Sequence, residues 1–93
     1  MSEKNVTVTV ANGRINVDPD SIQVKQNQDH VRWTCNTGAF TIDMPGFTIK
    51  HEHDAGKHHG LSGTFPTVGK VKYNVSAPGA ETLDPDVDII PAG

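Results

Sequence analysis

The chain has 93 residues, of which 34% are hydrophobic and 20% are charged, and its formal net charge is -3. This length predicts one domain, spanning residues 1–93 with an ordered core over roughly residues 4–91. The acidic balance argues against a nucleic-acid partner. A membrane partner is not expected either, because no apolar run approaches the roughly 20 residues of a membrane-spanning helix.

The apolar residues favour strands over helices. The sequence contains 10 Val, 6 Ile and 9 Thr, but only 2 Leu and 6 Ala. β-branched side chains suit a pleated surface and lose rotamer freedom in a helix. No segment shows a sustained apolar period of 3.6 residues. The composition therefore predicts an all-β fold.

The chain begins with the pattern of a hairpin. Residues 6–10 alternate apolar and polar side chains, and residues 15–17 do so again. Between them, Asn12 and Gly13 suit a tight turn that needs positive φ angles. Pro19 then interrupts, because proline lacks the N–H that a strand ladder requires. We expect two antiparallel strands followed by a change of partner.

Alternation returns along the rest of the chain, interrupted by turns. The further predicted strands are residues 22–24, 31–33, 40–44, 47–49, 71–75 and 87–90. Residues 50–60 have no apolar period and are predicted to form a long loop. About eight short strands at this spacing are typical of a sandwich or a barrel.

The same tripeptide stands at the start of two predicted strands. Asp-Pro-Asp occupies residues 18–20, just before residues 21–25, and residues 84–86, whose last residue begins the segment 86–90. The apolar side chains of the two segments are in the same phase. The repeat is either a coincidence or a sign that both strands enter one sheet from the same end. Strands that start level must run the same way, and the roughly 60 intervening residues suffice for a crossover. We therefore predict that residues 21–25 pair in parallel with residues 86–90.

Several segments resemble the cupredoxin-like family. Val17-Asp18-Pro19 is similar to its aromatic-x-Pro step, and Ile22 to Trp33 is similar to its I-x-V-x-x-G-D-x-V-x-W signature with one extra turn residue. Gly69 to Val75 resembles its G-x-Y-x-Y-x-C strand, and Leu83 to Ile90 its terminal strand. The resemblance implies a Greek-key β-sandwich, in which a strand leaves one sheet at the proline and joins the other.

The same resemblance argues against a type 1 copper centre. In that family the copper takes an early histidine, then Cys, His and usually Met from the last loop. Phe40, Val75 and Pro78 stand near the expected His, Cys and His positions, and neither His nor Met follows His59. Cys35 comes too early in the chain to replace the missing thiolate.

A histidine cluster is the strongest chemical feature. His51, His53, His58 and His59 fall within nine residues, and imidazole is the commonest protein ligand for Zn, Cu and Ni. If the strand from Phe47 persists, side-chain alternation would place His51 and His53 on one face, and Gly56 would let His58 or His59 complete a set of three or four ligands. The alternatives are a solvated polar loop that coordinates nothing and weak adventitious binding.

Asp84, Asp86 and Asp88 form an acidic stretch near the end of the sequence. Their alternation with apolar residues predicts a strand with an acidic outer face, because a calcium loop would require a glycine and a later glutamate that are both missing. This edge could also dock a basic partner.

No catalytic motif stands out, so we do not expect an enzyme. The sequence predicts a non-catalytic, cupredoxin-like binding module with an unidentified protein partner and no cofactor. The alternative is a metal-binding protein that uses the histidine-rich loop 51–59 for Cu, Zn or Ni. A single cysteine and the absence of a signal-peptide pattern favour the cytoplasm, although a trimmed secreted or periplasmic domain fits equally well. The predicted core comprises Val6, Val8, Val10, Ile22, Val24, Val31, Trp33, Ile42, Val71, Tyr73, Val75 and Ile89.

Overall fold

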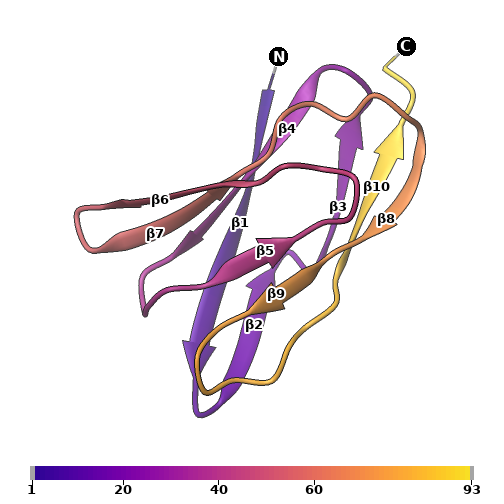
Figure 1. Cartoon of the computed structure of the whole chain (residues 1–93). Helices are drawn as coiled ribbons and strands as arrows, with labels where there is room; N and C mark the ends of the chain where they lie inside the picture. Colours follow the sequence, from indigo (N-terminus) through magenta and orange to yellow (C-terminus); the bar gives the residue numbers. More distant parts are fainter. Residues whose placement is uncertain (1, 93) are drawn as a thin grey trace.

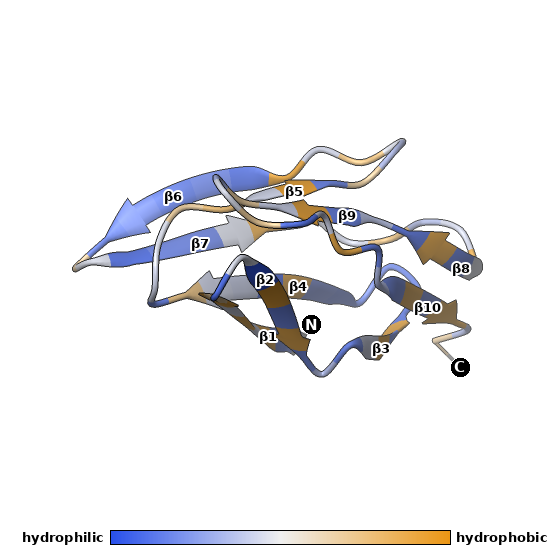
Figure 2. Ribbon diagram, turned by 90° about the horizontal axis from the view of Figure 1, so that it is seen from below, coloured by the Kyte–Doolittle hydropathy of each residue, from blue (hydrophilic) through white to orange (hydrophobic). Residues whose placement is uncertain are grey.

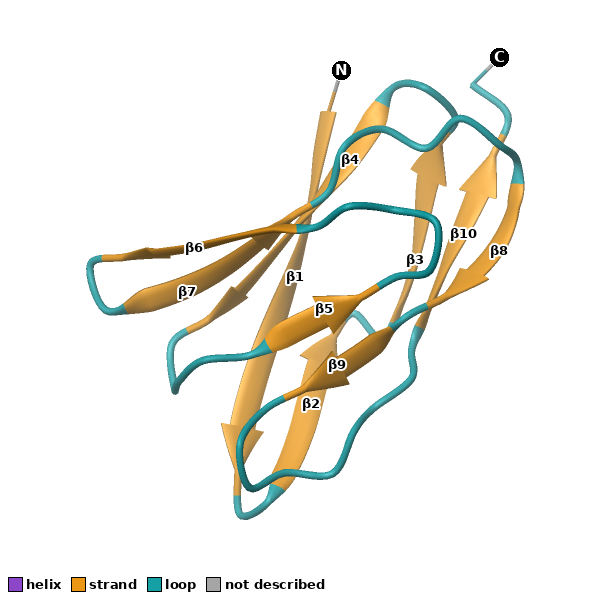
Figure 3. Ribbon diagram, in the orientation of Figure 1, coloured by secondary structure: helices purple, strands orange, loops and turns teal. Residues whose placement is uncertain are grey.

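The computed structural model describes residues 2–92, and its regular structure is entirely β-strand (Figures 1 and 3). Met1 and Gly93, which belong to the predicted domain, lie outside the described residues. No helix long and apolar enough to cross a membrane occurs between residues 2 and 92. The strands are β1 (Ser2–Ala11), β2 (Arg14–Asp18), β3 (Ser21–Lys25), β4 (Asp29–Cys35), β5 (Thr41–Asp43), β6 (Lys50–Asp54), β7 (Lys57–Leu61), β8 (Gly69–Lys72), β9 (Asn74–Ser76) and β10 (Asp86–Ile90).

The strands form a sandwich of two layers. One layer is a five-stranded sheet in the order β2-β1-β4-β7-β6. The other combines a three-stranded sheet, β3-β10-β8, with a two-stranded sheet, β5-β9. Only Tyr73 separates β8 from β9, so the chain runs directly from one of these sheets into the other (Figure 3). Figure 2 colours parts of β1, β4 and β10 as hydrophobic, and alternate residues of these strands are buried.

The predicted hairpin is confirmed. β1 and β2 pair antiparallel, with Val8 opposite Val17. Asn12 and Gly13 have φ angles of 55° and 74°, as a tight hairpin turn requires. The chain leaves this sheet at Pro19, whose peptide bond with Asp18 is cis, and continues in the other layer as β3.

The predicted parallel pairing is also confirmed. Ser21 lies opposite Asp86, and the register continues to Lys25 opposite Ile90. The Ser21 hydroxyl donates a hydrogen bond to Asp86 Oδ1 at 2.9 Å, which ties the starts of the two strands together. β10 is the middle strand of its sheet, because it also pairs antiparallel with β8.

One hydrophobic core fills the space between the layers. Ten of the twelve predicted core residues are buried, and Val10 and Val71 are partly buried against the cluster. The prediction missed seven buried residues: Ile15, Val17, Cys35, Phe40, Met44, Phe65 and Val87. Trp33 and Tyr73 lie at the centre, where the Trp33 indole Nε1–H donates to the Tyr73 hydroxyl at 3.1 Å.

Three predicted elements are wrong in detail. Residues 47–49 are not a strand, and the strand expected over residues 71–75 is divided at Tyr73. The long loop expected over residues 50–60 is instead the hairpin of β6 and β7. This hairpin carries polar side chains on both faces, so hydropathy could not mark its alternation. The observed ten strands therefore replace the predicted eight.

Candidate functional site

The β6–β7 hairpin projects from the sandwich and is the most distinctive surface feature. Figure 1 shows it reaching away from the other strands, and Figure 2 shows that it is almost wholly hydrophilic. All five residues of β6 are exposed. β6 is the last strand of its sheet, so no described residue pairs with its outer edge. Ala55 and Gly56 form the tip with φ angles of 51° and 79°.

Gly60 anchors the base of the hairpin. β7 pairs antiparallel with β4, which places Gly60 opposite the buried Trp33. A Cβ atom at Gly60 would lie 3.4 Å from Ile42, 3.5 Å from Ile49 and 3.6 Å from Phe40. The strand thus lies close over three apolar side chains, with room for a methyl group at ordinary van der Waals contact but not for a larger side chain. The base is held by the core while the tip extends into solvent.

The strand register divides the four predicted ligands between two faces. His53 lies opposite His58, and His51 lies opposite Gly60, so these histidines share one face, as expected for His51 and His53. His59 lies opposite Glu52 on the other face. Accordingly, no group of three or more His, Cys, Asp or Glu side chains within residues 2–92 is arranged to hold a metal ion.

Two of the histidines contact the body of the protein. His51 Nε2 accepts a hydrogen bond from the backbone N–H of Ile42 at 3.0 Å, and its ring meets Phe40 edge-on with centroids 6.3 Å apart. His59 Nδ1 lies 3.1 Å from the hydroxyl of Thr34. Both side chains therefore help to fasten the hairpin to its neighbours.

The other two histidines contact each other. The rings of His53 and His58 stack with their centroids 4.3 Å apart and an interplanar angle of 17°. His53 is exposed and His58 is partly exposed. Neither ring has a hydrogen-bond partner among the described residues. These two imidazoles are the part of the predicted ligand set that is not hydrogen-bonded to another described residue.

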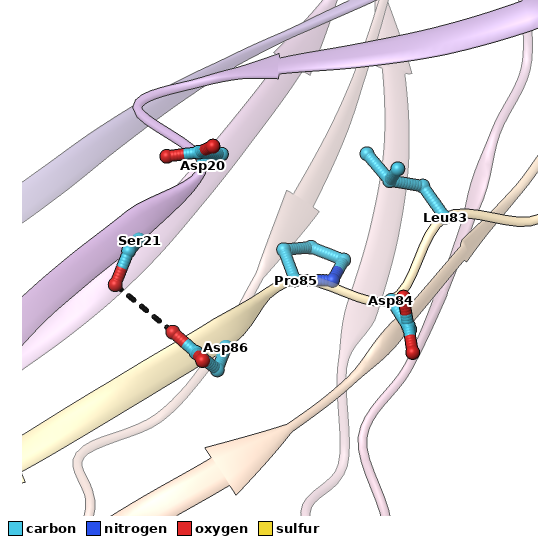
Figure 4. Close-up of a pocket in the computed structure, with 6 residues that line it drawn as sticks. All are labelled: Asp20, Ser21, Leu83, Asp84, Pro85 and Asp86. Atoms are coloured by element: carbon cyan, nitrogen blue, oxygen red, sulfur yellow. Dashed lines mark hydrogen bonds between the residues drawn. The ribbon is translucent and has the colours of Figure 1, made fainter.

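An open pocket lies where β3 and β10 begin, with a volume of about 300 Å³ (Figure 4). Three of the aspartates that flank Pro19 and Pro85 line this pocket. The full lining is Asp20, Ser21, Leu83, Asp84, Pro85 and Asp86. Within β10, Asp86 and Asp88 alternate with buried Val87 and Ile89, which confirms the acidic outer face for these two residues, whereas Asp84 precedes the strand. In the register, Asp86 stands opposite Lys72 and Asp88 opposite Lys70 on β8.

A charged cluster on the outer face of the five-stranded sheet was not predicted. Glu3 Oε2 accepts hydrogen bonds from His30 Nε2 at 3.0 Å and from Arg32 Nε at 3.2 Å. These contacts, chiefly the one from His30, lower the pKa of Glu3. Single, well-separated charged residues give no sequence signal of such a cluster, because only the parallel pairing of β1 with β4 brings them together.

No model of a known protein family matches the chain, and no curated protein matches it significantly. Among solved structures, the chain is similar to the crystal structure of the cysteine protease inhibitor EhICP2 from Entamoeba histolytica. The match covers 97% of each chain with a TM-score of 0.61 and 15% sequence identity. At this identity the likeness concerns the fold alone.

Proposed function

We propose that this protein is a non-catalytic binding module that uses the β6–β7 hairpin to contact a protein partner. The observation that carries the proposal is the exposure of β6, which presents five exposed residues and an unpaired backbone edge. The N–H and C=O groups of such an edge can pair with an extended segment of another protein. The anchored base holds this edge in place, which lowers the entropic cost of binding.

The charges of the hairpin favour selective rather than indiscriminate pairing. Lys50, Glu52, Asp54 and Lys57 bring both signs to the two strands. Lys50 Nζ lies 3.5 Å from Glu52 Oε2. Charged side chains on an edge strand suppress association with unrelated strands, and complementary charges on a partner set the register. The proposed partner surface is therefore polar and carries both signs.

The cupredoxin-like Greek-key assignment forms part of this proposal. It is supported by the change of sheet at Pro19 and by the parallel pairing of β3 with β10. By the resemblance, Phe40 and Val75 occupy the positions of the family's copper ligands, and both are buried apolar residues. A binding role, rather than electron transfer through type 1 copper, fits these substitutions.

A shortened hairpin tests the contact role. Replacing residues 53–58 by Asn-Gly removes two cross-strand pairs and closes a two-residue turn on the pair formed by Glu52 and His59. Proteins captured by the intact domain are identified, purified and titrated against both forms. We expect at least a ten-fold loss of affinity for the shortened form. Equal affinities, with both forms folded, would place the contact elsewhere.

A cysteine protease is the first partner to test. One solved structure with a similar fold is titled a cysteine protease inhibitor, and the match extends over 97% of both chains. The assay titrates a papain-type protease, acting on a fluorogenic peptide, with the intact and shortened domains. Inhibition by the intact domain that weakens in the shortened form supports this partner class. No inhibition at high micromolar concentration removes this class of partner.

A further inference from the structure

The stacked rings of His53 and His58 form a second candidate site on the hairpin, independent of any protein partner. The two residues lie directly opposite each other on neighbouring strands, and their ring centroids are 4.3 Å apart. The ring planes are nearly parallel, at 17°, and neither ring is hydrogen-bonded to another described residue. To bind one ion, both side chains must rotate out of the stack, so that one nitrogen lone pair from each ring points at a common position roughly 2.0–2.1 Å from each nitrogen.

His51 and His59 differ from this pair in their contacts. The Nε2 lone pair of His51 is occupied by the N–H of Ile42, so in its neutral form the remaining nitrogen, Nδ1, carries the proton. A metal could bind His51 only by breaking that hydrogen bond. His59 lies on the opposite face and is held by Thr34. The structure therefore separates two imidazoles that contact each other from two that are hydrogen-bonded to neighbouring strands.

We propose that His53 and His58 form a two-ligand site for a divalent ion of the late first-row transition metals, with Cu²⁺ bound most tightly. Imidazole suits Cu, Ni and Zn, and the affinity of nitrogen sites peaks at Cu²⁺ among these ions. Water completes the coordination, since no third His, Cys, Asp or Glu converges on the pair within residues 2–92. Only the neutral imidazole coordinates, so acid releases the metal.

The experiment titrates the full chain with Cu²⁺ and with Zn²⁺ by calorimetry at pH 7.5 and at pH 5. His53→Asn and His58→Asn each remove one ligand from an accessible position. His59→Asn and His30→Asn remove histidines of the same chain that the proposal leaves out, and serve as matched controls. Thermal unfolding of each variant shows that it is folded. Electron paramagnetic resonance of the Cu²⁺ complex gives the number of coordinated nitrogens.

We expect one saturable Cu²⁺ site, at least ten-fold weaker in each of His53→Asn and His58→Asn and changed less than three-fold in the two controls. The spectrum should show two nitrogen ligands, and binding should weaken at least ten-fold at pH 5. Similar losses in all four variants would mean adventitious binding and overturn the proposal. Absence of saturable binding would also overturn it. An equal loss in His51→Asn, in a folded protein, would replace the pair by a larger ligand set.

Discussion

Replacing Tyr73 by phenylalanine would remove one hydroxyl from the centre of the core. That hydroxyl accepts the hydrogen bond of the Trp33 indole at 3.1 Å, and the exposed fractions of Trp33 and Tyr73 are only 0% and 1%. The two rings meet edge-on with centroids 5.3 Å apart, and phenylalanine can keep this contact. The substitution therefore isolates the loss of the hydrogen bond from a change of packing.

The expected loss of stability follows from the Trp33 indole N–H, which would remain buried without its acceptor. A buried N–H without an acceptor costs about 1–3 kcal/mol. We expect the free energy of unfolding of Tyr73→Phe to fall by about this amount, and the Tm to fall by about 4–8 °C for each kcal/mol in a domain of this size. Thr7→Val is the control, because it removes a hydroxyl from an exposed position of β1 and should change stability by less than about 0.5 kcal/mol.

A double-mutant cycle measured by urea unfolding tests the reasoning. In a Trp33→Phe background there is no indole N–H to leave unpaired, so Tyr73→Phe should cost less than half of what it costs in the natural chain. The same loss in both backgrounds would show that the hydrogen bond is not the cause. A loss no larger than that of Thr7→Val would contradict the burial of the pair.

Three further predictions concern single residues. Burial raises the pKa of Tyr73. The neutral Tyr73 side chain therefore contributes its full stabilisation below the unfolded pKa of 10.0, and this stabilisation is lost as the pH rises through the folded pKa. Urea unfolding between pH 8 and 11.5 should show this decline in the natural chain and a smaller decline in Tyr73→Phe. Gly13 has a φ of +74°, whereas Gly63 lies in open space with no such constraint, so Gly13→Ala should lower stability by about 1 kcal/mol more than Gly63→Ala in thermal unfolding. Gly60→Ala should leave stability nearly unchanged, because the new Cβ would lie 3.4 Å from Ile42, which is an ordinary van der Waals contact. Gly60→Leu should overpack the base of the hairpin and lower the free energy of unfolding by about 1–3 kcal/mol, as measured by urea unfolding.

The sequence could predict those parts of the fold in which one strand face is buried. The alternation before and after Asn12-Gly13 marks one buried face, and that hairpin is confirmed. The repeated Asp-Pro-Asp step located the start of β3 and β10 to within one residue, and the parallel pairing of the two segments that it suggested is confirmed. Phe65 was missed because it lies outside any strand, where no periodicity reports that its side chain is fully buried.

The sequence located the candidate site, but it could not show which of its histidines are available as ligands. Residues 51–59 stand out by histidine content alone, yet their hairpin is polar on both faces and was predicted as a loop. Whether His51 is open to a metal or held by Ile42 depends on how β5 lies against β6, a tertiary contact without a local signal. Cross-strand pairing likewise decides that His58, rather than His59, stands beside His53.

The place of β10 between β3 and β8 has a consequence for biosynthesis. Ser21 and Asp86, which start the parallel pair, are 65 positions apart in the chain. Until the ribosome has released residues 86–90, β3 and β8 each lack the neighbour that joins them. Closing so long a loop makes folding slow, on the order of milliseconds to seconds for such topologies. A nascent chain of this protein therefore carries open strand edges until β10 emerges, and such edges are where an incompletely folded chain is exposed to aggregation.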